Sequence, residues 1–486
     1  RYIYSLVLEN QVSKAVNLIK QNKNKNNSKF FESYLMLILD SLKKDDFNQA
    51  YNYVSKANKV AKEDRFNLAI LNILNQYIFV FKENKILKNQ KNFGNLSTIS
   101  ETFQRCYLND PKTDEYFLNL INSNTGDFSR YTYFYLTYLI QNNRVKDAKE
   151  ITNNIKFINS TLLLSQGKSW IENHNSQRLT EVFSCKNHND LISEFLFLIS
   201  NLYSSQDDFK KSNFYLNLSY FLNSKFYFNL SLVAENKFSN NEYEKAKKIL
   251  KKFKKQDYFY YWYRVKKEAQ IIAKLKNEND SLNFIISNFK KLENYNEKIL
   301  FDIANFYKNA KKYNEAIKYY SKVIEMVDKD LEIKADVMYR RGGSYERLGN
   351  YDQSDKDMIQ SLEIIPDNAY VLNYLAYSWL ERDYKINSAI NMLEKAYAIE
   401  SDDPYIIDSI GWAYYLLADY EKAEKYLRRA VELMPDDSIV NDHYGDNLWR
   451  LGQKIQARYF WRSVLKMENT DEELLESLNS KIIKGL

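Results

Sequence analysis

The fold is decided by residues 404–435, PYIIDSIGWAYYLLADYEKAEKYLRRAVELMP. Two small residues of this stretch, Gly411 and Ala423, lie twelve positions apart. Tyr414 follows the first by three positions, and Leu427 follows the second by four. Small residues on two consecutive helices let the helices approach closely, because a larger side chain would overpack the contact. The stretch therefore predicts a tightly packed pair of antiparallel helices.

The same pair recurs about every 34 residues, which indicates a repeat array. The small positions are Ala304, Gly342, Ala376, Gly411 and Gly445 on the first helices, and Ala316, Ser354, Ala389, Ala423 and Ala457 on the second helices. Gly349 and Gly452 fall between paired helices, where a helix end favours a residue with positive φ. The pattern predicts five consecutive helix pairs over residues 297–467.

The spacing continues upstream in a weaker form. The small residues at matching positions are Ala15, Ala50, Ala148, Ser212, Ala234 and Ala246. Residues 58–130 carry no clear anchors, and residues 89–98 and 122–128 are expected to be loops. A helix pair cannot bury its apolar face alone, so neighbouring pairs must stack into a solenoid. We expect about eleven to thirteen pairs in the whole chain.

The composition excludes folds that depend on many turns. Among 486 residues there are 10 glycines and 4 prolines, too few for a β-sandwich, a β-barrel or a glycine-looped nucleotide-binding fold. Hydrophobic residues make up 45% and charged residues 27%, so a large core can form. No apolar run reaches about 18 residues, so no membrane-spanning helix is expected. The first residue is arginine and not methionine, so we expect a trimmed start, and the absence of a signal peptide excludes nothing.

The segment 404–435 resembles a tetratricopeptide repeat. The positions that match that family's pattern of small, aromatic, small, small and proline residues are Gly411, Tyr414, Ala423, Ala430 and Pro435. The segment departs from the pattern at Ile407, where the family often has tryptophan, and at Leu427, where it prefers phenylalanine. The resemblance implies an all-α fold, a right-handed superhelical solenoid of antiparallel helix pairs that binds other proteins and performs no chemistry.

On this basis we expect three regions: degenerate helical repeats over residues 1–295, a regular array over 297–469 and a capping helix over 470–486. The capping helix would bury an apolar face made of Leu474, Leu475, Leu478, Ile482 and Ile483. Acidic residues at its start (Asp471, Glu472, Glu473) and lysines near its end (Lys481, Lys484) suit the helix dipole.

The sequence offers no site for catalysis. No phosphate loop, HExxH, GxSxG or CxxC motif occurs, and the Gly342-Gly343 pair is better explained by helix packing. His443 stands beside Asp442, but neighbouring side chains on a helix point apart, so we interpret it as a structural or solvent-exposed histidine. Cys106 and Cys185 are too few for a disulfide framework and are expected to be small buried residues. The three histidines are too scattered for a metal site. We predict no enzyme activity, no cofactor and no metal.

In the family that the array resembles, the first helix of each pair lines the concave side. The candidate partner-binding residues on that side are Tyr339, Asn373, Asp408 and Asp442 in one column, Tyr377, Trp412 and Asp446 in a second, Tyr415 and Trp449 in a third, and Arg450 next to it. Polar groups could accept main-chain N–H donors of an extended peptide, while aromatic rings bury its side chains. The alternative is that the rings pack between helices. The lysine and arginine clamp of chaperone-tail-binding relatives is not recognised on this face.

Charge is unevenly distributed. Residues 331–486 hold 19 Lys+Arg and 28 Asp+Glu, a net charge of −9, whereas the preceding 330 residues carry +16. The densest basic run, residues 245–255, is interpreted as the solvated side of a helix whose buried stripe is Ala246, Ile249, Leu250 and Phe253. A contact with an acidic partner, an anionic membrane surface or a nucleic acid is the alternative.

Residues 368–379, 408–412 and 441–446 resemble a bacterial branch of exported repeat proteins. That branch includes outer-membrane lipoprotein adaptors that partner a carboxyl-terminal processing protease. The resemblance implies an adaptor at the periplasm or the periplasmic face of the outer membrane, with the cytoplasm as the alternative. It implies a protein or peptide partner, such as an envelope protease, and no nucleic acid. A scaffold for assembly of a larger complex remains the alternative function.

Overall fold

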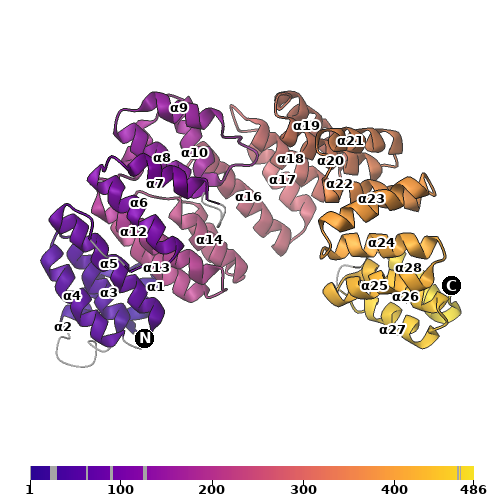
Figure 1. Cartoon of the computed structure of the whole chain (residues 1–486), viewed down its shortest axis with the longest axis horizontal. Helices are drawn as coiled ribbons and strands as arrows, with labels where there is room; N and C mark the ends of the chain where they lie inside the picture. The colour runs from indigo at the N-terminus through magenta and orange to yellow at the C-terminus, as the bar shows by residue number, and fades with distance from the viewer. Residues whose placement is uncertain are drawn as a thin grey trace. The chain divides into compact units, whose positions relative to one another are not determined.

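The computed structural model describes residues 2–21, 30–61, 64–87, 91–123, 129–467, 470 and 472–486. These residues form 28 α-helices and contain no strand, so the all-α prediction is confirmed (Figure 1). They divide into two compact units, residues 1–292 and 293–486. Within the described part, each helix is too short or too polar to cross a membrane.

Unit 2 is a series of antiparallel helix pairs followed by one more helix. Its helices are α18 (Glu297–Asn309), α19 (Tyr313–Met326), α20 (Leu331–Glu346), α21 (Tyr351–Ile364), α22 (Ala369–Glu381), α23 (Ile386–Ile399), α24 (Pro404–Leu416), α25 (Tyr420–Leu433), α26 (Ser438–Arg450), α27 (Lys454–Val464) and α28 (Glu472–Lys484). Each first helix packs most extensively on its own partner, and each second helix packs on the first helix of the next pair. The five predicted pairs are confirmed.

Small residues sit where paired helices approach most closely. A Cβ atom on Gly411 would lie 2.8 Å from Cγ of Leu427, and one on Gly445 would lie 2.6 Å from the Trp461 indole. The alanines of the pattern are fully buried in unit 2 and in the weaker upstream repeats. Had these positions faced water, the stacked-pair interpretation would have failed, so the prediction is confirmed.

Local sequence fixes the ends of these helices. Asp403 caps α24 by accepting hydrogen bonds from the amides of Tyr405 and Ile406 at 3.0 and 3.1 Å, and Pro404 occupies the first turn. Gly349 and Gly452 adopt φ of +71° and +80° between paired helices, as predicted. The first helices also contact one another, α22 with α24 and α24 with α26. They therefore form the inner layer of the stack, on which the candidate residues lie.

Unit 1 consists of shorter and less regular helices around one core. They are α1 (Tyr2–Leu8), α2 (Val12–Gln21), α3 (Phe31–Leu42), α4 (Phe47–Val60), α5 (Arg65–Glu83), α6 (Asn95–Leu108), α7 (Thr113–Ile121), α8 (Ser129–Gln141), α9 (Val145–Asn153), α10 (Leu162–Glu172), α11 (Gln177–Val182), α12 (His188–Ser204), α13 (Phe209–Leu222), α14 (Asn229–Ser239), α15 (Tyr243–Leu250), α16 (Tyr258–Leu275) and α17 (Glu278–Phe289). Helix α13 packs on α1, α2 and α3, and α12 packs on α5 and α6. In unit 1, helices that are far apart in the sequence therefore also contact each other, in addition to the contacts between neighbouring helices.

One local expectation in unit 1 needs correction. The predicted loop at residues 89–98 is too long, because α6 already begins at Asn95. Of the second predicted loop, residues 124–128 lie outside the described residues, as do 88–90 of the first. The stretch without recognisable anchors holds α5, α6 and α7, whose buried faces consist of large side chains such as Tyr77, Phe103 and Phe117. The small-residue pattern fails there because bulky rings fill the contacts.

The two cysteines are joined to each other, which corrects their interpretation as unpaired buried residues. Cys106 on α6 and Cys185, just before α12, form a disulfide with a Cα–Cα distance of 5.5 Å and a sequence separation of 79. Both residues are buried. The bond links α6 to the turn between α11 and α12.

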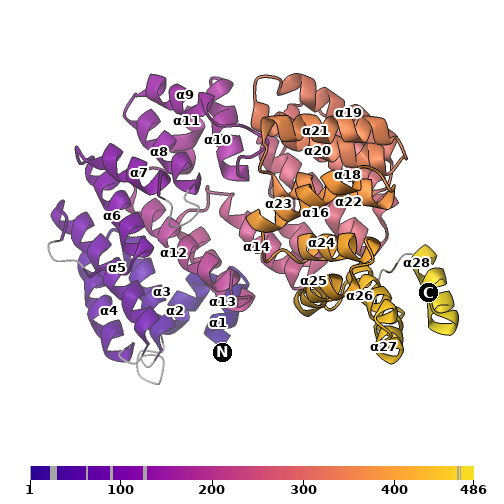
Figure 2. The ribbon, with the colours of Figure 1, turned by 45° about the vertical axis from the view of Figure 1, so that its right-hand side comes forward.

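Helix α28 packs against α27 at the end of unit 2 (Figure 2). Leu478 is fully buried, and Nε of Arg458 donates to the carbonyl of Ile482 at 2.9 Å. Ile483, expected on the buried face, is instead 76% exposed. Asp471, expected in the first turn, lies outside the described residues. Lys481 does more than suit the helix dipole, because it reaches two carboxylates of α26.

Candidate functional site

The ten candidate residues all lie on first helices of unit 2 or at their ends, but they differ in exposure. Asp408, Asp442 and Asp446 are buried, Arg450 is exposed, and the half-buried residues are Tyr339, Asn373, Tyr377, Trp412, Tyr415 and Trp449. Solvent therefore reaches mainly the aromatic members. The carboxylates lie underneath, where their partners must come from the chain itself.

Asp408 is paired across consecutive repeats. Its Oδ2 lies 2.8 Å from Nδ1 of His443, which is one helix further along the stack and also buried. Burial acts to lower the pKa of His443, but the charge and hydrogen bond of Asp408 outweigh it, and the pKa is raised. The histidine thus carries its proton more readily than a free imidazole. This pair ties α24 to α26.

Asp442 and Asp446 bind the end of the chain. Nζ of Lys481 lies 2.8–2.9 Å from all four of their carboxylate oxygens. Asp446 also accepts a hydrogen bond from Nε1 of Trp461 at 3.0 Å. Burial, followed by the charge of Asp442, raises the pKa of Asp446 to about 6 although Lys481 opposes the shift. Both carboxylates are occupied by the capping helix.

The remaining candidates of the first column differ in their contacts. The ring of Tyr339 meets that of Tyr374 on the next first helix edge-on, with centroids 5.8 Å apart. Buried acceptor atoms Oδ1 of Asn373 and Oδ1 of Asp408 have no hydrogen-bond donor among the described residues. Both oxygen atoms are shielded from solvent. Within this first column, Tyr339 and Asp408 contact the next first helix of the stack.

The aromatic candidates form a stacked ridge across three first helices. The Trp412 indole stacks on Tyr415 with centroids 4.5 Å apart and on His443 with centroids 4.0 Å apart. Tyr377 lies next to the same imidazole, 6.4 Å between centroids. Nε of Arg450 donates to the Tyr415 hydroxyl at 3.5 Å. We call Tyr377, Trp412, Tyr415 and His443 the aromatic ridge.

Trp449 is set apart from this ridge. Its indole packs on Trp461 with centroids 5.5 Å apart, and Arg458 lies over it at 4.7 Å. A Cβ atom on Gly485 would fall within 2 Å of the indole, so the residues after α28 run directly against it. Trp449 therefore serves the attachment of α28, together with Asp442 and Asp446.

A cavity of about 370 Å³ opens at the other end of the row, between α18, α20 and α22. Its lining is Lys308, Lys311, Tyr313, Tyr339, Arg340, Gly343, Arg347 and Tyr374. Burial lowers the pKa of Lys308, and the neighbouring Arg340 and Arg347 lower it further. Of this lining, only Tyr339 was a candidate from the sequence. The cations were missed because they fall at different positions of their repeats, so no single column contains them.

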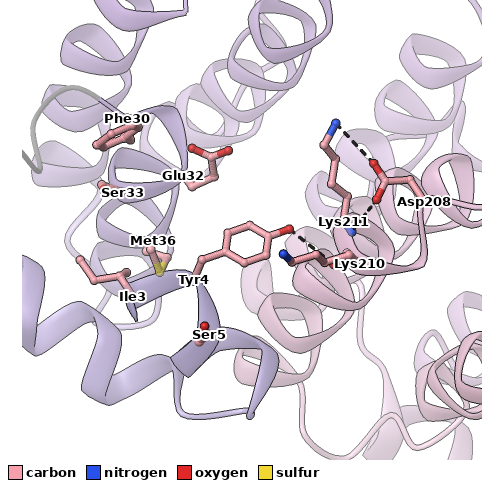
Figure 3. A pocket seen from close by; sticks show the side chains of 10 residues that line it. All are labelled: Ile3, Tyr4, Ser5, Phe30, Glu32, Ser33, Met36, Asp208, Lys210 and Lys211. Carbon is pink, nitrogen blue, oxygen red and sulfur yellow. Dashed lines mark hydrogen bonds and ion pairs between the residues drawn. The ribbon is translucent and has the colours of Figure 1, made fainter. Parts of the chain in front are cut away.

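Another cavity, of about 690 Å³, lies in unit 1 between α1, α3 and α13 (Figure 3). Tyr4 points across it, its ring stacked on Phe214 with centroids 4.5 Å apart and its hydroxyl 3.4 Å from the carbonyl oxygen of Lys210. Lys211 and Asp208 face each other at 3.4 Å. Two lysines and two carboxylates line this cavity, so it presents no net charge that would select a ligand.

The basic run in unit 1 is shorter as a helix than predicted, because α15 ends at Leu250. Ala246, Leu250 and Phe253 are buried as expected. Lys247 pairs with Glu244 at 2.8 Å, and Lys252 lies over the ring of Tyr220 at 4.8 Å. Part of the run thus has partners within the unit, in agreement with a solvated helix side.

Within the described ranges, no group of three or more histidine, cysteine, aspartate or glutamate side chains could hold a metal ion. His443, the most prominent candidate in the sequence, contacts Asp408 and the aromatic ridge. Its arrangement connects helices and supports rings.

Family comparison agrees with the repeat assignment. Models described as "Tetratricopeptide repeat" match residues 297–326, 335–368 and 404–437. The TPR repeat-containing protein PA4667 of Pseudomonas aeruginosa is 33% identical over 111 residues, which cover 23% of this chain and 19% of the relative. Anaphase-promoting complex subunit 3 of Schizosaccharomyces pombe is 20% identical over 117 residues, 24% of this chain and 16% of the relative. The chain thus matches less than a fifth of the length of these relatives.

Among solved structures, a tetratricopeptide repeat protein from Parabacteroides merdae is 13% identical and covers 60% of this chain and 99% of its own, with a TM-score of 0.40. A tetratricopeptide repeat protein of Thermus thermophilus covers 39% of this chain and 100% of its own at 16% identity, with a TM-score of 0.34. Tetratricopeptide repeats mediate protein–protein interactions and are typically not catalytic. The matched segments 297–326, 335–368 and 404–437 are therefore tetratricopeptide repeats, as the sequence pattern predicted.

Proposed function

We propose that the chain is a non-catalytic adaptor that binds an extended peptide segment of another protein along the first helices of unit 2. The observation that carries this proposal is the aromatic ridge. Trp412 and Tyr415 remain half-exposed although they stack on each other and on His443. Half-exposed tyrosine and tryptophan side chains on a rigid support are the usual anchors of protein recognition.

The surroundings of the ridge support this use. Asp408 fixes His443 from below, and Nε1 of Trp412 donates to Glu381 on the preceding first helix at 2.8 Å. The rings are therefore held in place before a ligand arrives, which reduces the conformational entropy lost on binding. Arg450, exposed beside Tyr415, offers a charged group at the edge of the ridge.

A selection of random dodecapeptides displayed on phage tests the proposal, with binding of the enriched peptides measured by fluorescence anisotropy. We expect Trp412→Ala with Tyr415→Ala to weaken binding by about tenfold or more. The control is Ile455→Ala with Tyr459→Ala, which removes two exposed apolar side chains from the second helix α27. Asp408 is not replaced in this test, because it is buried and its loss would affect stability as well as binding. If both double variants bind like the wild type, the ridge is not the binding surface.

We further propose that the protein works in an oxidising compartment, the bacterial periplasm or the periplasmic face of the outer membrane. The pairing of both cysteines supports this, because disulfides persist in such compartments and are rare in the cytosol. Protein isolated from its natural source without reductant, then denatured and treated with a maleimide reagent, should react only after reduction. Labelling of Cys106 and Cys185 without reduction would contradict the proposal.

The partner that we propose is an envelope protease of the carboxyl-terminal processing type. Support comes from residues 368–379, 408–412 and 441–446, which resemble adaptors of such proteases. Purified protease and adaptor should form a complex that Trp412→Ala with Tyr415→Ala weakens. A complex that forms equally well with this variant would indicate a scaffold that uses another surface.

A further inference from the structure

The 370 Å³ cavity between α18, α20 and α22 gathers positive charge without matching negative charge in its lining. Lys308 comes from α18, Lys311 from the following turn, Arg340 from α20 and Arg347 from the residue directly after α20. The lining belongs entirely to the described part of the chain and contains no carboxylate. Four cations therefore surround one cavity.

The carboxylates of Asp336 and Glu346 do not line the cavity, but each pairs with an arginine that does. Asp336 pairs with Arg340 at 3.1 Å, and Glu346 lies 3.5 Å from Arg347. Glu346 also accepts a hydrogen bond from the Tyr374 hydroxyl at 3.0 Å. These two carboxylates stand against Lys308, Arg340 and Arg347, which leaves one positive charge in excess among the five groups. The lowered pKa of Lys308, caused by burial and by the two arginines, is consistent with this excess.

This local positive charge differs in sign from the net charge of unit 2. Residues 293–486 hold 26 Lys+Arg and 35 Asp+Glu, a net charge of −9. An acidic ligand is therefore repelled by most of unit 2 and attracted at this cavity. Such local complementarity selects the position and register of a ligand more than it adds overall affinity.

Helix α22 contributes a tyrosine to the cavity and another to the aromatic ridge. Tyr374 lines the cavity, and Tyr377 of the ridge lies three residues later on the same helix, so the two side chains share one side of α22. Tyr313, Tyr339 and Tyr374 form aromatic parts of the lining. A carboxylate within such a lining can be held by lysine and arginine while its methylene groups contact the rings.

We propose that this cavity binds a glutamate or aspartate side chain of the peptide that lies on the aromatic ridge. The inference rests on the proposed peptide-binding function and adds its selectivity: the segment bound by the adaptor carries an acidic residue on the side of its ridge-binding residues that faces α20.

Two synthetic decapeptides, (Ser-Glu)5 and (Ser-Gln)5, serve as probes with the full chain, and fluorescence anisotropy measures their binding. At about 50 mM salt we expect (Ser-Glu)5 to bind at least about tenfold more tightly than (Ser-Gln)5, and the difference to shrink at about 200 mM. Lys308→Met with Arg347→Gln should remove the difference. Lys318→Met with Arg429→Gln takes the same two residue types from exposed positions on second helices and should leave it unchanged.

An equal loss in both double variants, or equal binding of the two probes to the wild type, overturns the acidic-residue proposal. The phage-selected peptides separate it from the proposed function. If they depend on Trp412 and Tyr415 but not on Lys308 and Arg347, the adaptor function stands and the cavity proposal fails. If (Ser-Glu)5 binds through the cavity while no selected peptide depends on the ridge, the cavity proposal stands without the ridge.

Discussion

The first helices of unit 2 (α18, α20, α22, α24 and α26) carry charged side chains at both ends of their row, but the surroundings of these charges differ. At α26 two buried carboxylates meet Lys481 from the chain's own last helix at 2.8–2.9 Å. At α18 and α20 four cations surround a cavity whose lining contains no carboxylate. Both buried carboxylates at α26 bind a cation of the chain's last helix, whereas at the cavity end Asp336 and Glu346 pair with the two arginines from outside the lining.

This difference indicates which charged residues maintain the fold. A buried ion pair costs desolvation energy and is strongly destabilising when one partner is removed. A cluster of like charges already opposes itself, so removing one member costs little. Replacing a lysine at the α26 end should therefore lower the free energy of unfolding, whereas replacing a lysine at the cavity end should leave it unchanged or raise it.

Lys481→Met should have the largest effect. It leaves Asp442 and Asp446 buried without a cation, which costs about 3–5 kcal/mol of unfolding free energy. Since burial already raises the pKa of Asp446 to about 6, protonation should reduce the loss at pH 5 relative to pH 8. Hydrogen exchange should rise in α26 and α28 of the full-length protein.

Lys484→Met is the matched control, because Lys484 is exposed near the end of the same helix. It should change stability by no more than about 0.5 kcal/mol. Equal effects of the two substitutions would mean that the carboxylates of α26 do not depend on Lys481.

The sequence revealed the repeats but not the roles of their charges. Small residues such as Gly411 and Ala423 are required in each repeat, so their period is visible in one sequence. The contact of Asp408 with His443 depends instead on how successive repeats stack, and the 35 positions between them exceed the repeat by one. Tyr339 and Tyr374 have the same separation and also touch. This offset is the signal that could have revealed the contact.

Two features lacked any such signal. The disulfide between Cys106 and Cys185 spans irregular helices of unit 1, whose large buried rings leave no period to place the cysteines side by side. The cavity end combines Lys308 of one repeat with Arg340 and Arg347 of the next. Only the stacking of successive helix pairs brings these side chains around one cavity.

His443→Gln should have the next largest effect, at the centre of the row. It removes a buried hydrogen bond to a charged group, which contributes about 1.5–3 kcal/mol. Because the folded-state pKa of His443 is raised above 6.5, the extra stability from its charge is present below that pH and is lost as pH rises through the folded-state value.

Chemical denaturation at pH 6 and pH 9 measures this dependence. The gap between wild type and His443→Gln should be wider at pH 6. His174→Asn is the control, because His174 is exposed and asparagine tolerates its φ of +57°. An equal gap at both pH values would show that folding leaves the pKa of His443 unchanged.

Gly445→Ala and Gly343→Ala compare the two ends by packing. A Cβ atom at Gly445 would lie 2.6 Å from Trp461, and overpacking of this kind costs about 1–3 kcal/mol. At Gly343 the nearest atom, the Tyr374 hydroxyl, is 3.5 Å away. Alanine in a helix is there favoured by about 0.5–1 kcal/mol. Thermal unfolding should therefore shift in opposite directions, and a loss of stability in both variants would mean that the cavity end is packed as tightly as α26.

Lys308→Met should have the smallest effect and is the most direct test of the comparison. The half-buried ammonium lies near Arg340 and Arg347, which together with burial lower its pKa, so removing its charge relieves repulsion. The methionine keeps most of the apolar stem of the side chain. We expect unfolding free energy to be unchanged or to rise by up to about 1 kcal/mol.

The effect of Lys308→Met should decline at high salt, because added ions screen the same repulsion in the wild type. Lys481→Met, the same change at the other end of the row, should remain destabilising, since its partners are buried and less screened. If Lys308→Met instead destabilises unit 2 as Lys481→Met does, Lys308 supports the fold. The cavity would then be part of the packing of the repeats and not a place kept for an acidic residue.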